Sequence, residues 1–364
     1  MTQLFFKKLK YSYKKTYTLP FDQKVPNDIK DYLLSSNILK IWFKFLKRYL
    51  FLVLNKQANL ERSVIVKKHK KILWINLSAP SLGDSLMDLS SRILLKQRDL
   101  DLFTDNFNAV LYKNDQYFEN VYTKITEVCE RKYDLIIIDS FSTRTVKIKC
   151  RIAFNTEFVS MFGFFNGPDI NRTLYSFYRM NSLLGQQVSQ RDISKLYRPS
   201  ITLSPEDIDL PIDISLPKKY IVIAVGGEWE YRTYNHWIKV IKLILKDSPR
   251  QSVILVGSKN ALDYLEKNSA HIDRTHIQNL VNKISFLQTA SIIKSASLVL
   301  CCDGGLMHAA CAVDARMIVL MSRIKKEMRL TKLVRAEVLF DNADVNNIKP
   351  QRVYKKYKKL QTLL

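Results

Sequence analysis

From residue 71 onward, short apolar runs alternate with polar loops and with segments whose apolar residues recur at helical spacing. The runs at 71–77, 220–227 and 252–258 are continuous in their apolar character, and turn residues bound them. Continuous apolar runs of this length are typical of strands buried on both faces. Because helical segments follow them, the pattern predicts parallel sheets with crossover helices.

The expected elements form two groups, separated by the proline-containing acidic segment 201–217. The first group has strands at 71–77, 108–112 and 135–139, a helix at 86–97, and a sheet edge with a substrate-facing loop at 154–167. The second has strands at 220–227, 252–258, 297–302 and 315–322 and helices at 236–246, 260–268, 285–295 and 306–313. We therefore predict an α/β protein with two Rossmann-like domains whose parallel sheets face a cleft. The expected boundaries are a basic helical extension at 1–70, a first domain at 71–203, a second domain at 204–347 and a basic helix at 348–364.

The N-terminal extension contains one apolar and basic segment, 38–54, which we expect to be a helix. Its basic residues share one side of that helix and its aromatic and leucine residues supply the remainder. One interpretation is a helix lying in the surface of an anionic membrane. The other is a helix packed on the protein with its lysines in water. The pattern alone leaves both open.

The formal net charge is +24, which favours an anionic partner: a nucleic acid, a membrane lipid or a phosphorylated substrate. Residues 1–71 hold 15 Lys and 2 Arg against 3 Asp and 1 Glu, so the charge is concentrated there. The sequence has no RNP, zinc-finger or helix-turn-helix signature, so we expect no nucleic-acid partner. The five cysteines form no CxxC pair, which fits a reducing cytoplasm. We expect neither a signal peptide nor a transmembrane helix.

Glycine is sparse, with nine residues in 364, and six of them follow strand-like runs. These six are Gly83, Gly226, Gly227, Gly257, Gly304 and Gly305. Glycine is kept where the backbone turns sharply or approaches a ligand, and turns from strand to helix are where open α/β sheets bind ligands. No GxGxxG or GxxxxGK[ST] motif is present, which disfavours the usual dinucleotide site and the P-loop.

Four side chains near these turns are candidates for chemistry. Asp84 could act as a general base or could cap its helix. Asp303 could help a phosphate approach the backbone or could cap the next helix, and His308 one turn later could be functional or structural. Arg232 could clamp a phosphate oxygen. The Asp99–Asp101 and Asp207–Asp209 pairs stand in polar segments and are interpreted as solvated acids, so no metal site is expected.

Three segments together resemble glycosyltransferase family nine, the bacterial heptosyltransferases of lipopolysaccharide core synthesis. They are 72–97 with its Gly-Asp turn, 220–244 with a tryptophan that starts the helix, and 284–320 with Asp, Gly and His in the family's spacing. The resemblance implies a GT-B fold and an inverting, metal-independent transfer that needs no cofactor. It also implies ADP-heptose as the nucleotide-sugar donor, Kdo of lipid A as the phosphorylated lipid acceptor, and a cytoplasmic enzyme peripheral to the inner face of the inner membrane.

The resemblance also implies roles for individual residues. Asp84 matches the general base, and Ser81 and Gly83 in the same turn are expected to contact the acceptor. The expected donor-binding residues are Gly226, Gly227, Arg232, Gly257, Asp303, Gly304, Gly305 and His308. The chain departs from the family at Asn235, where a lysine is usual, and Arg232 could supply the missing cation.

Three alternatives stay open at the level of sequence. One is a GT-B-type sugar-nucleotide epimerase, which would act on a nucleotide sugar without a lipid acceptor. The second is a basic nucleic-acid-binding protein. The third is a non-catalytic scaffold that retains the fold.

Overall fold

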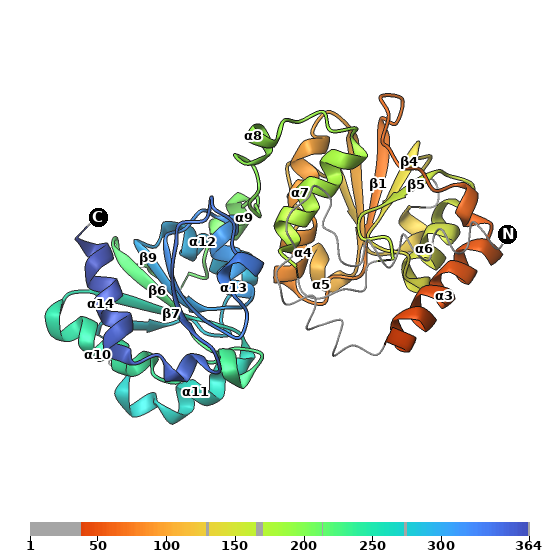
Figure 1. Ribbon diagram of the computed structural model, residues 1–364. Coiled ribbons are helices and arrows are strands. Elements are labelled where there is room, and N and C mark those ends of the chain that lie inside the picture. The colour runs from red at the N-terminus through yellow and green to blue at the C-terminus, as the bar shows by residue number, and fades with distance from the viewer. Residues whose placement is uncertain (1–37, 129–130, 165–169, 213, 273–274, 363–364) are drawn as a thin grey trace. The chain divides into compact units, whose positions relative to one another are not determined.

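The computed structural model describes residues 38–128, 131–164, 170–212, 214–272 and 275–362 (Figure 1). The chain divides into two compact units, Met1–Tyr197 and Arg198–Leu364. This division falls close to the boundary between 203 and 204 expected from the sequence. Each unit is an α/β structure around one parallel sheet.

The first unit contains a five-stranded sheet in the order β3-β2-β1-β4-β5, and its neighbouring strands are paired in parallel. Trp74 in the central strand pairs with Leu102 on one side and with Ile137 on the other. The central position of the first strand places the loop that follows it in the middle of the carboxyl edge. The strands are β1 Lys71–Asn76, β2 Asp99–Thr104, β3 Asn120–Tyr122, β4 Leu135–Ile138 and β5 Phe158–Ser160.

Helices cover both faces of this sheet: α3 and α6 lie on one side, and α4 and α7 on the other (Figure 1). The helix bounds are α3 Ile38–Leu54, α4 Leu82–Asp88, α5 Asn106–Ala109, α6 Thr143–Ala153, α7 Arg172–Leu183 and α8 Gln190–Ile193, with 3-10 helices η1 Gln57–Asn59, η2 Ser90–Leu95 and η3 Ile125–Glu127. A sheet covered on both faces needs continuous apolar strands, which is the pattern that the sequence shows.

The second unit contains a six-stranded parallel sheet in the order β11-β10-β9-β6-β7-β8. Its strands are β6 Tyr220–Ala224, β7 Ser252–Val256, β8 Ile277–Asn279, β9 Leu298–Cys302, β10 Met317–Ser322 and β11 Ala336–Asp341. Its helices are α9 Pro205–Ile208, α10 Trp237–Asp247, α11 Leu262–Lys267, α12 Phe286–Ser295, α13 Gly305–Ala312 and α14 Pro350–Gln361, with 3-10 helices η4 Glu230–Arg232, η5 Lys259–Ala261, η6 Ser269–His271, η7 Lys326–Met328 and η8 Val345–Asn347.

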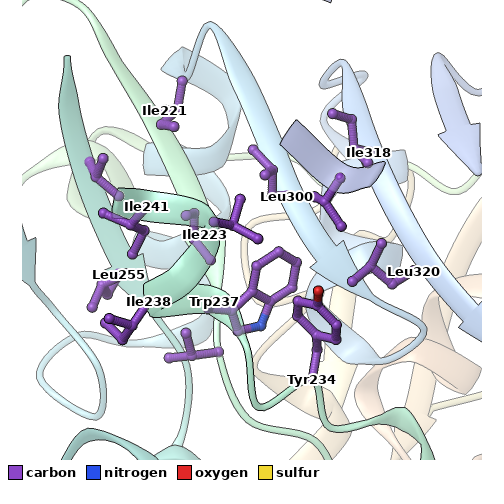
Figure 2. Packing of buried hydrophobic residues seen from close by; sticks show 14 of the residues in the cluster. Ile221, Ile223, Tyr234, Trp237, Ile238, Ile241, Leu255, Leu300, Ile318 and Leu320 are labelled. Carbon is purple, nitrogen blue, oxygen red and sulfur yellow. The ribbon is translucent and has the colours of Figure 1, made fainter. Parts of the chain in front are cut away.

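The core of the second unit fixes the start of α10. Figure 2 shows Tyr234 and Trp237 packed among isoleucine and leucine side chains of the sheet. Their ring centroids are 4.9 Å apart at an interplanar angle of 73°, and the Tyr234 hydroxyl donates to the Ile348 carbonyl over 2.7 Å. Two anchored aromatic residues therefore hold the end of the loop that joins β6 to α10.

Two expectations for the first unit are wrong. The segment 108–112, expected as a strand, includes the end of α5, and the strands nearby are β2 and β3. The helix α5 begins there because Asp105 caps it, with Oδ1 accepting the Asn108 backbone N–H over 2.9 Å. The interpretation of Asp101 as a solvated acid is also wrong. Asp101 is buried within β2 and accepts from Tyr133 Oη and from Asn120 Nδ2, each over 2.8 Å. Its hydrogen bonds replace those to water, so a polar residue occupies a buried strand position.

The expected helix at 86–97 also differs. It begins earlier, at Leu82, and continues as the 3-10 helix η2 from Ser90. The Ser90 hydroxyl donates to the Met87 carbonyl over 2.7 Å, a local bond that competes with regular helix.

Candidate functional site

Each sheet has a point where its connections diverge. In the second unit β6 and β9 are neighbours, but the chain runs from β6 to β7 on one side and from β9 to β10 on the other. In the first unit β1 and β4 have the same relation, with β2 and β5 on their outer sides. Ligands of open α/β sheets bind at the carboxyl ends of strands at such a switch point. The predicted site residues of both units lie in the loops at these two positions, except Gly257, which follows β7.

The turn after β9 presents an open helix end. Gly304 is the N-cap of α13, and no side chain caps the helix there. A Cβ placed on Gly304 would meet no heavy atom within 4 Å in the described part of the chain, and one on Gly305 would meet only the Phe286 ring at 3.9 Å. The first N–H groups of α13 therefore face space that an anion could occupy.

Asp303 does not cap this helix, so that alternative is wrong. Its carboxylate is buried, with 2% of the side chain exposed, and is turned toward two arginines. Its Oδ2 lies 3.2 Å from Arg232 Nη1 and 3.8 Å from Arg329 Nε. His308, one turn into α13, is also buried, and its backbone N–H donates to the Gly304 carbonyl over 3.2 Å.

Three predicted donor glycines are required by the packing of the chain itself. Gly226 has φ +84° and a Cβ there would lie 2.8 Å from the Ala261 Cβ. A Cβ on Gly227 would lie 2.5 Å from Thr233 Oγ1, and one on Gly257 would lie 2.6 Å from the Val225 carbonyl oxygen. The close approach that these glycines permit is thus between segments of the protein.

At the position where the resemblance predicts a lysine, the chain has a neutral asparagine. Asn235 is exposed, and its backbone N–H donates to Asn346 Oδ1 over 2.7 Å. The nearby cations are Arg232 and Arg329, both at Asp303. Sequence reasoning missed Arg329, because its contact with Asp303 depends on β10 lying next to β9 in the folded sheet.

In the first unit, Asp139 immediately after β4 holds the loop that leads to Asp84. Its Oδ2 accepts the backbone N–H groups of Leu77 and Ser78, each over 2.7 Å, and its Oδ1 accepts from Thr145 Oγ1 over 2.8 Å. Asp139 is buried. A carboxylate with this set of donors is structural, and it fixes where the chain leaves β1.

Asp84 is the third residue of α4 and not its cap. The cap is Ser81, whose hydroxyl donates to Asp84 Oδ2 over 2.7 Å and accepts the Asp84 backbone N–H over 3.2 Å. The side chain of Asp84 is 24% exposed, whereas Gly83 is buried within the first turn. The Asp84 carboxylate is therefore oriented by its own helix and reachable from solvent.

Two residues that sequence reasoning missed stand beside Asp84. Arg172 donates through Nε to Asp88 Oδ1 over 2.7 Å and also through Nη2 to Asp88 Oδ2, while its Nη1 lies 3.6 Å from Asp84 Oδ1. Burial raises the pKa of Asp88 to about 6, against the opposing effect of Arg172. Asp88 could have been found from its spacing, since residues four apart share a helix face. Arg172 lies on α7, and no local pattern connects it to α4.

The DxD pairs and the remaining acids give no sign of a metal site. Asp207 accepts from the backbone N–H of Ser204 over 2.9 Å in a capping box at the start of α9. Among the described residues, no group of three or more His, Cys, Asp or Glu side chains is arranged to hold a metal ion.

Residues 184–352, which span most of the second unit, match the family model described as glycosyltransferase family 9 (heptosyltransferase). Most of the second unit is therefore similar to glycosyltransferase family nine. The match includes every predicted donor-binding residue of this chain and the loops after β6 and β9. No curated protein matches the sequence.

Solved structures support the same assignment at the level of fold. The ADP-heptose lipopolysaccharide heptosyltransferase II of E. coli is 17% identical with a TM-score of 0.65, over 81% of this chain and 100% of that one. A family 9 glycosyltransferase of Veillonella parvula is 12% identical with a TM-score of 0.67, over 82% and 99%. The E. coli heptosyltransferase WaaC with ADP is 15% identical with a TM-score of 0.58, over 79% and 99%. The predicted GT-B class, with two parallel-sheet α/β domains, is confirmed.

Proposed function

We propose that this glycosyltransferase moves a heptose from ADP-heptose to Kdo of a lipid A acceptor, without a metal and with inversion at the anomeric carbon. The observation that carries the proposal is the uncapped N-terminus of α13, beside an unobstructed Gly304, at the switch point of the family-matched unit. A helix end of this kind favours a diphosphate. A structure of the E. coli relative WaaC contains ADP, which supports the choice of nucleotide.

The donor contacts follow from the same turn. The diphosphate accepts backbone N–H groups at Gly304 and Gly305, and Arg232 faces the charge that develops on the leaving group. Arg329 helps to hold Arg232 and Asp303 in place. Such preorganised donors are worth roughly 3 kcal/mol each in comparable sites. In this proposal Gly226, Gly227, Gly257 and His308 shape the pocket walls.

In the proposed reaction, Asp84 accepts the proton of an acceptor hydroxyl as the hydroxyl oxygen bonds to the anomeric carbon. The bond from that carbon to the diphosphate oxygen breaks, and ADP departs with the electron pair. Attack opposite the leaving group inverts the centre. Ser81 and the turn at Gly83 orient the carboxylate and border the acceptor, and Arg172 opposes excess negative charge there.

The decisive experiment compares Asp84→Asn with a matched control. Asp192 has the same local geometry at the start of α8. Its Oδ2 accepts from Ser189 Oγ over 2.7 Å, and its backbone N–H donates to the same hydroxyl over 3.1 Å. We expect Asp84→Asn to abolish transfer from ADP-heptose and to leave the ADP dissociation constant unchanged, whereas Asp192→Asn keeps full activity. Full activity in Asp84→Asn would remove the general base.

A panel of nucleotides tests the donor. Calorimetric and thermal-shift titrations with ADP, UDP, GDP and CMP are expected to show tight binding for ADP alone. A ligand at 100 times its dissociation constant stabilises the folded state by about 2.7 kcal/mol, which a melting curve resolves. Preference for UDP would redirect the proposal toward another sugar nucleotide.

We also propose that the enzyme docks on the cytoplasmic face of the inner membrane through α3. Phe45, Tyr49 and Leu52 of α3 are buried in the first unit, so one side of the helix is packed on the protein. A second apolar stripe is exposed and consists of Leu39, Phe43, Leu50 and Leu54. These four recur at helical spacing on one face, with exposed Lys40 and Lys47 beside them. No helix in the described residues is long and apolar enough to cross a membrane.

An exposed apolar stripe bordered by lysines is the pattern of a helix that lies in an anionic interface. Each Lys or Arg near such a surface adds about 1 kcal/mol. This docking would bring the enzyme to an acceptor that is itself a membrane lipid.

A further inference from the structure

The loop between β6 and α10 borders a hollow that none of the roles above uses. Its volume is about 620 Å³. It is lined by Glu228, Trp229, Glu230, Tyr231, Arg232, Arg323 and Asp344. All of these residues belong to the second unit, and Arg232 also contacts Asp303 at the proposed diphosphate site. The hollow therefore adjoins the place where the leaving group would lie.

The exposed indole of Trp229 stands on a fixed backbone. Trp229 is 54% exposed. Its backbone is held in place, because its carbonyl accepts from the Arg232 backbone N–H over 2.9 Å and from Thr233 Oγ1 over 3.0 Å. The next aromatic residue is held too, because the Tyr231 carbonyl accepts from Ser322 Oγ over 2.6 Å. The exposure of Trp229 is thus a property of an ordered loop, and a rigid aromatic face is available at low entropic cost.

The charges of the hollow argue against a phosphate. Three acids line it, Glu228, Glu230 and Asp344, against two arginines. Arg323 donates to the Ala343 carbonyl, and Arg232 contacts Asp303 and the Tyr231 hydroxyl at the edge of the hollow nearest the proposed diphosphate site. A second anion would meet uncompensated carboxylates here.

The same groups suit a neutral ligand rich in hydroxyls. Within the described ranges, the carboxylates of Glu228 and Glu230 make no hydrogen bond or ion pair, so their oxygens can accept hydroxyl groups. Trp229 offers an apolar face for the C–H side of a ring. The Tyr231 ring already carries the Arg323 guanidinium at 4.0 Å, so an aromatic cage for a cation is not available.

We infer that this hollow binds the pyranose ring of a sugar, with Trp229 stacked on the ring and with Glu228 and Glu230 accepting its hydroxyls. The inference rests on the proposed function, because it places a substrate sugar beside the proposed diphosphate site. The ring belongs either to the donor or to the acceptor. Both present the same chemistry, and the experiment separates them.

The experiment uses the full chain with Trp229→Ala, Trp229→Phe and the double variant Glu228→Gln/Glu230→Gln. The control is Leu262→Ala, which truncates another exposed apolar residue of the second unit. Calorimetry gives the dissociation constants of ADP and ADP-heptose, and steady-state kinetics gives KM for Kdo-lipid A. Thermal melts of all variants are expected to stay within about 2 °C of the wild type, because Trp229 is exposed.

We expect Trp229→Ala to leave ADP affinity within twofold of the wild type. If the donor sugar occupies the hollow, the dissociation constant of ADP-heptose rises at least tenfold. If the acceptor sugar occupies it, KM for Kdo-lipid A rises at least tenfold with donor affinity unchanged. Trp229→Phe keeps most of the function, and the double glutamine variant shifts the same constant as Trp229→Ala.

Unchanged donor affinity and unchanged acceptor KM in both Trp229→Ala and the double variant would overturn the inference. A wild-type protein that fails to bind ADP would count against the proposed function alone. For that case, saturation-transfer NMR with free heptose and glucose at millimolar concentration reports on the hollow directly. Magnetisation transfer to the free sugar that is present with the wild type and lost with Trp229→Ala supports the sugar site. Equal magnetisation transfer with both proteins rejects it.

Discussion

At the scale of single residues, Arg172 connects two carboxylates of one helix that differ in exposure. Asp88 is buried and accepts hydrogen bonds from two nitrogens of Arg172, Nε and Nη2. Asp84 is partly exposed to solvent, and its Oδ1 lies 3.6 Å from the third nitrogen, Nη1. Asp84 and Asp139 are the other charged groups that act on Asp88, and both raise its pKa. Protonation of Asp88 would therefore release Arg172 toward Asp84, where an ion pair with Arg172 would compete with the approach of an acceptor hydroxyl.

This arrangement predicts a pH dependence of turnover. The Asp88 pKa is about 6, so activity is expected to fall as the pH drops through that value. Asp88→Asn mimics the protonated form, and we expect its turnover above pH 6 to be reduced about tenfold, which corresponds to about 1.4 kcal/mol. Its profile should also lose the step near pH 6. The measurement is kcat against pH for both proteins; superimposable profiles would contradict the positioning role of Arg172.

Lys149 gives a second prediction at this scale. Its side chain is buried and donates to Gln57 Oε1 over 2.6 Å and to the Phe154 carbonyl over 3.0 Å. Burial lowers the pKa of Lys149 from 10.5 to about 8. Below about pH 8 the folded state must hold a buried charge that the unfolded chain keeps in water, and this penalty disappears as the pH rises toward 10.5.

The free energy of unfolding should therefore increase with pH between about 8 and 10.5, relative to a variant without this amine. The change is of the order of 3 kcal/mol for a shift of this size. Denaturant unfolding of the wild type, Lys149→Met and the exposed control Lys147→Met across this pH range tests it. A constant difference between wild type and Lys149→Met would show that the buried amine does not titrate there.

At the scale of elements, two glycine-bearing turns of the second unit, those after β9 and β7, are expected to respond to substitution in opposite ways. Gly304 has extended backbone that any residue adopts, and a Cβ there would point into open space. Gly304→Ala should thus cost at most about 1 kcal/mol of stability while raising the ADP dissociation constant at least tenfold, because the methyl group would occupy the proposed phosphate position.

Gly257→Ala is the contrasting variant. Its Cβ would lie 2.6 Å from the Val225 carbonyl oxygen, so β6 and β7 would have to move apart at their ends. We expect a loss of roughly 1–3 kcal/mol in unfolding free energy. Melting curves and ADP titrations of both variants separate the effects. Normal ADP affinity in a folded Gly304→Ala protein would place the diphosphate elsewhere.

The elements that the sequence predicts best are those buried on both faces. The strands β1, β4, β6, β7, β9 and β10 are confirmed, because continuous apolar runs leave few alternatives. The strand β2 was not predicted because it contains the acid Asp101. The carboxylate of Asp101 accepts hydrogen bonds from Tyr133 and Asn120, which come from distant parts of the chain. For α3, one side of the helix is packed on the protein, and the membrane interpretation stays a proposal that the exposed stripe supports.

The sequence predicts which loops form the site, but it does not predict which side chains meet there. Glycine turns after strands locate the loops, because backbone geometry is a local property. The partners of those loops are not local: Arg172 reaches α4 from α7, and Arg329 reaches Asp303 from beyond β10. Which cation meets which carboxylate depends on strand order, and strand order appears only when the chain has folded.

At the scale of the whole molecule, the formal net charge of +24 and the stripe on α3 make separable contributions to membrane binding. Charge acts over a Debye length of about 10 Å at 0.1 M salt and about 3 Å at 1 M, whereas apolar burial persists in salt. Binding of the full chain to vesicles with anionic lipid should therefore weaken as salt rises, but a residual fraction should remain bound.

The double variant Phe43→Ser/Leu50→Ser should lose that residual fraction and keep the salt-sensitive part, while Phe107→Ser, at an exposed position of the first unit away from α3, should behave as wild type. Point substitutions are needed because removal of residues 1–60 would also remove Leu52 from the core of the first unit. Sedimentation with vesicles at low and high salt gives both components. If the double variant and the wild type are released from the vesicles identically at high salt, the stripe does not bind lipid.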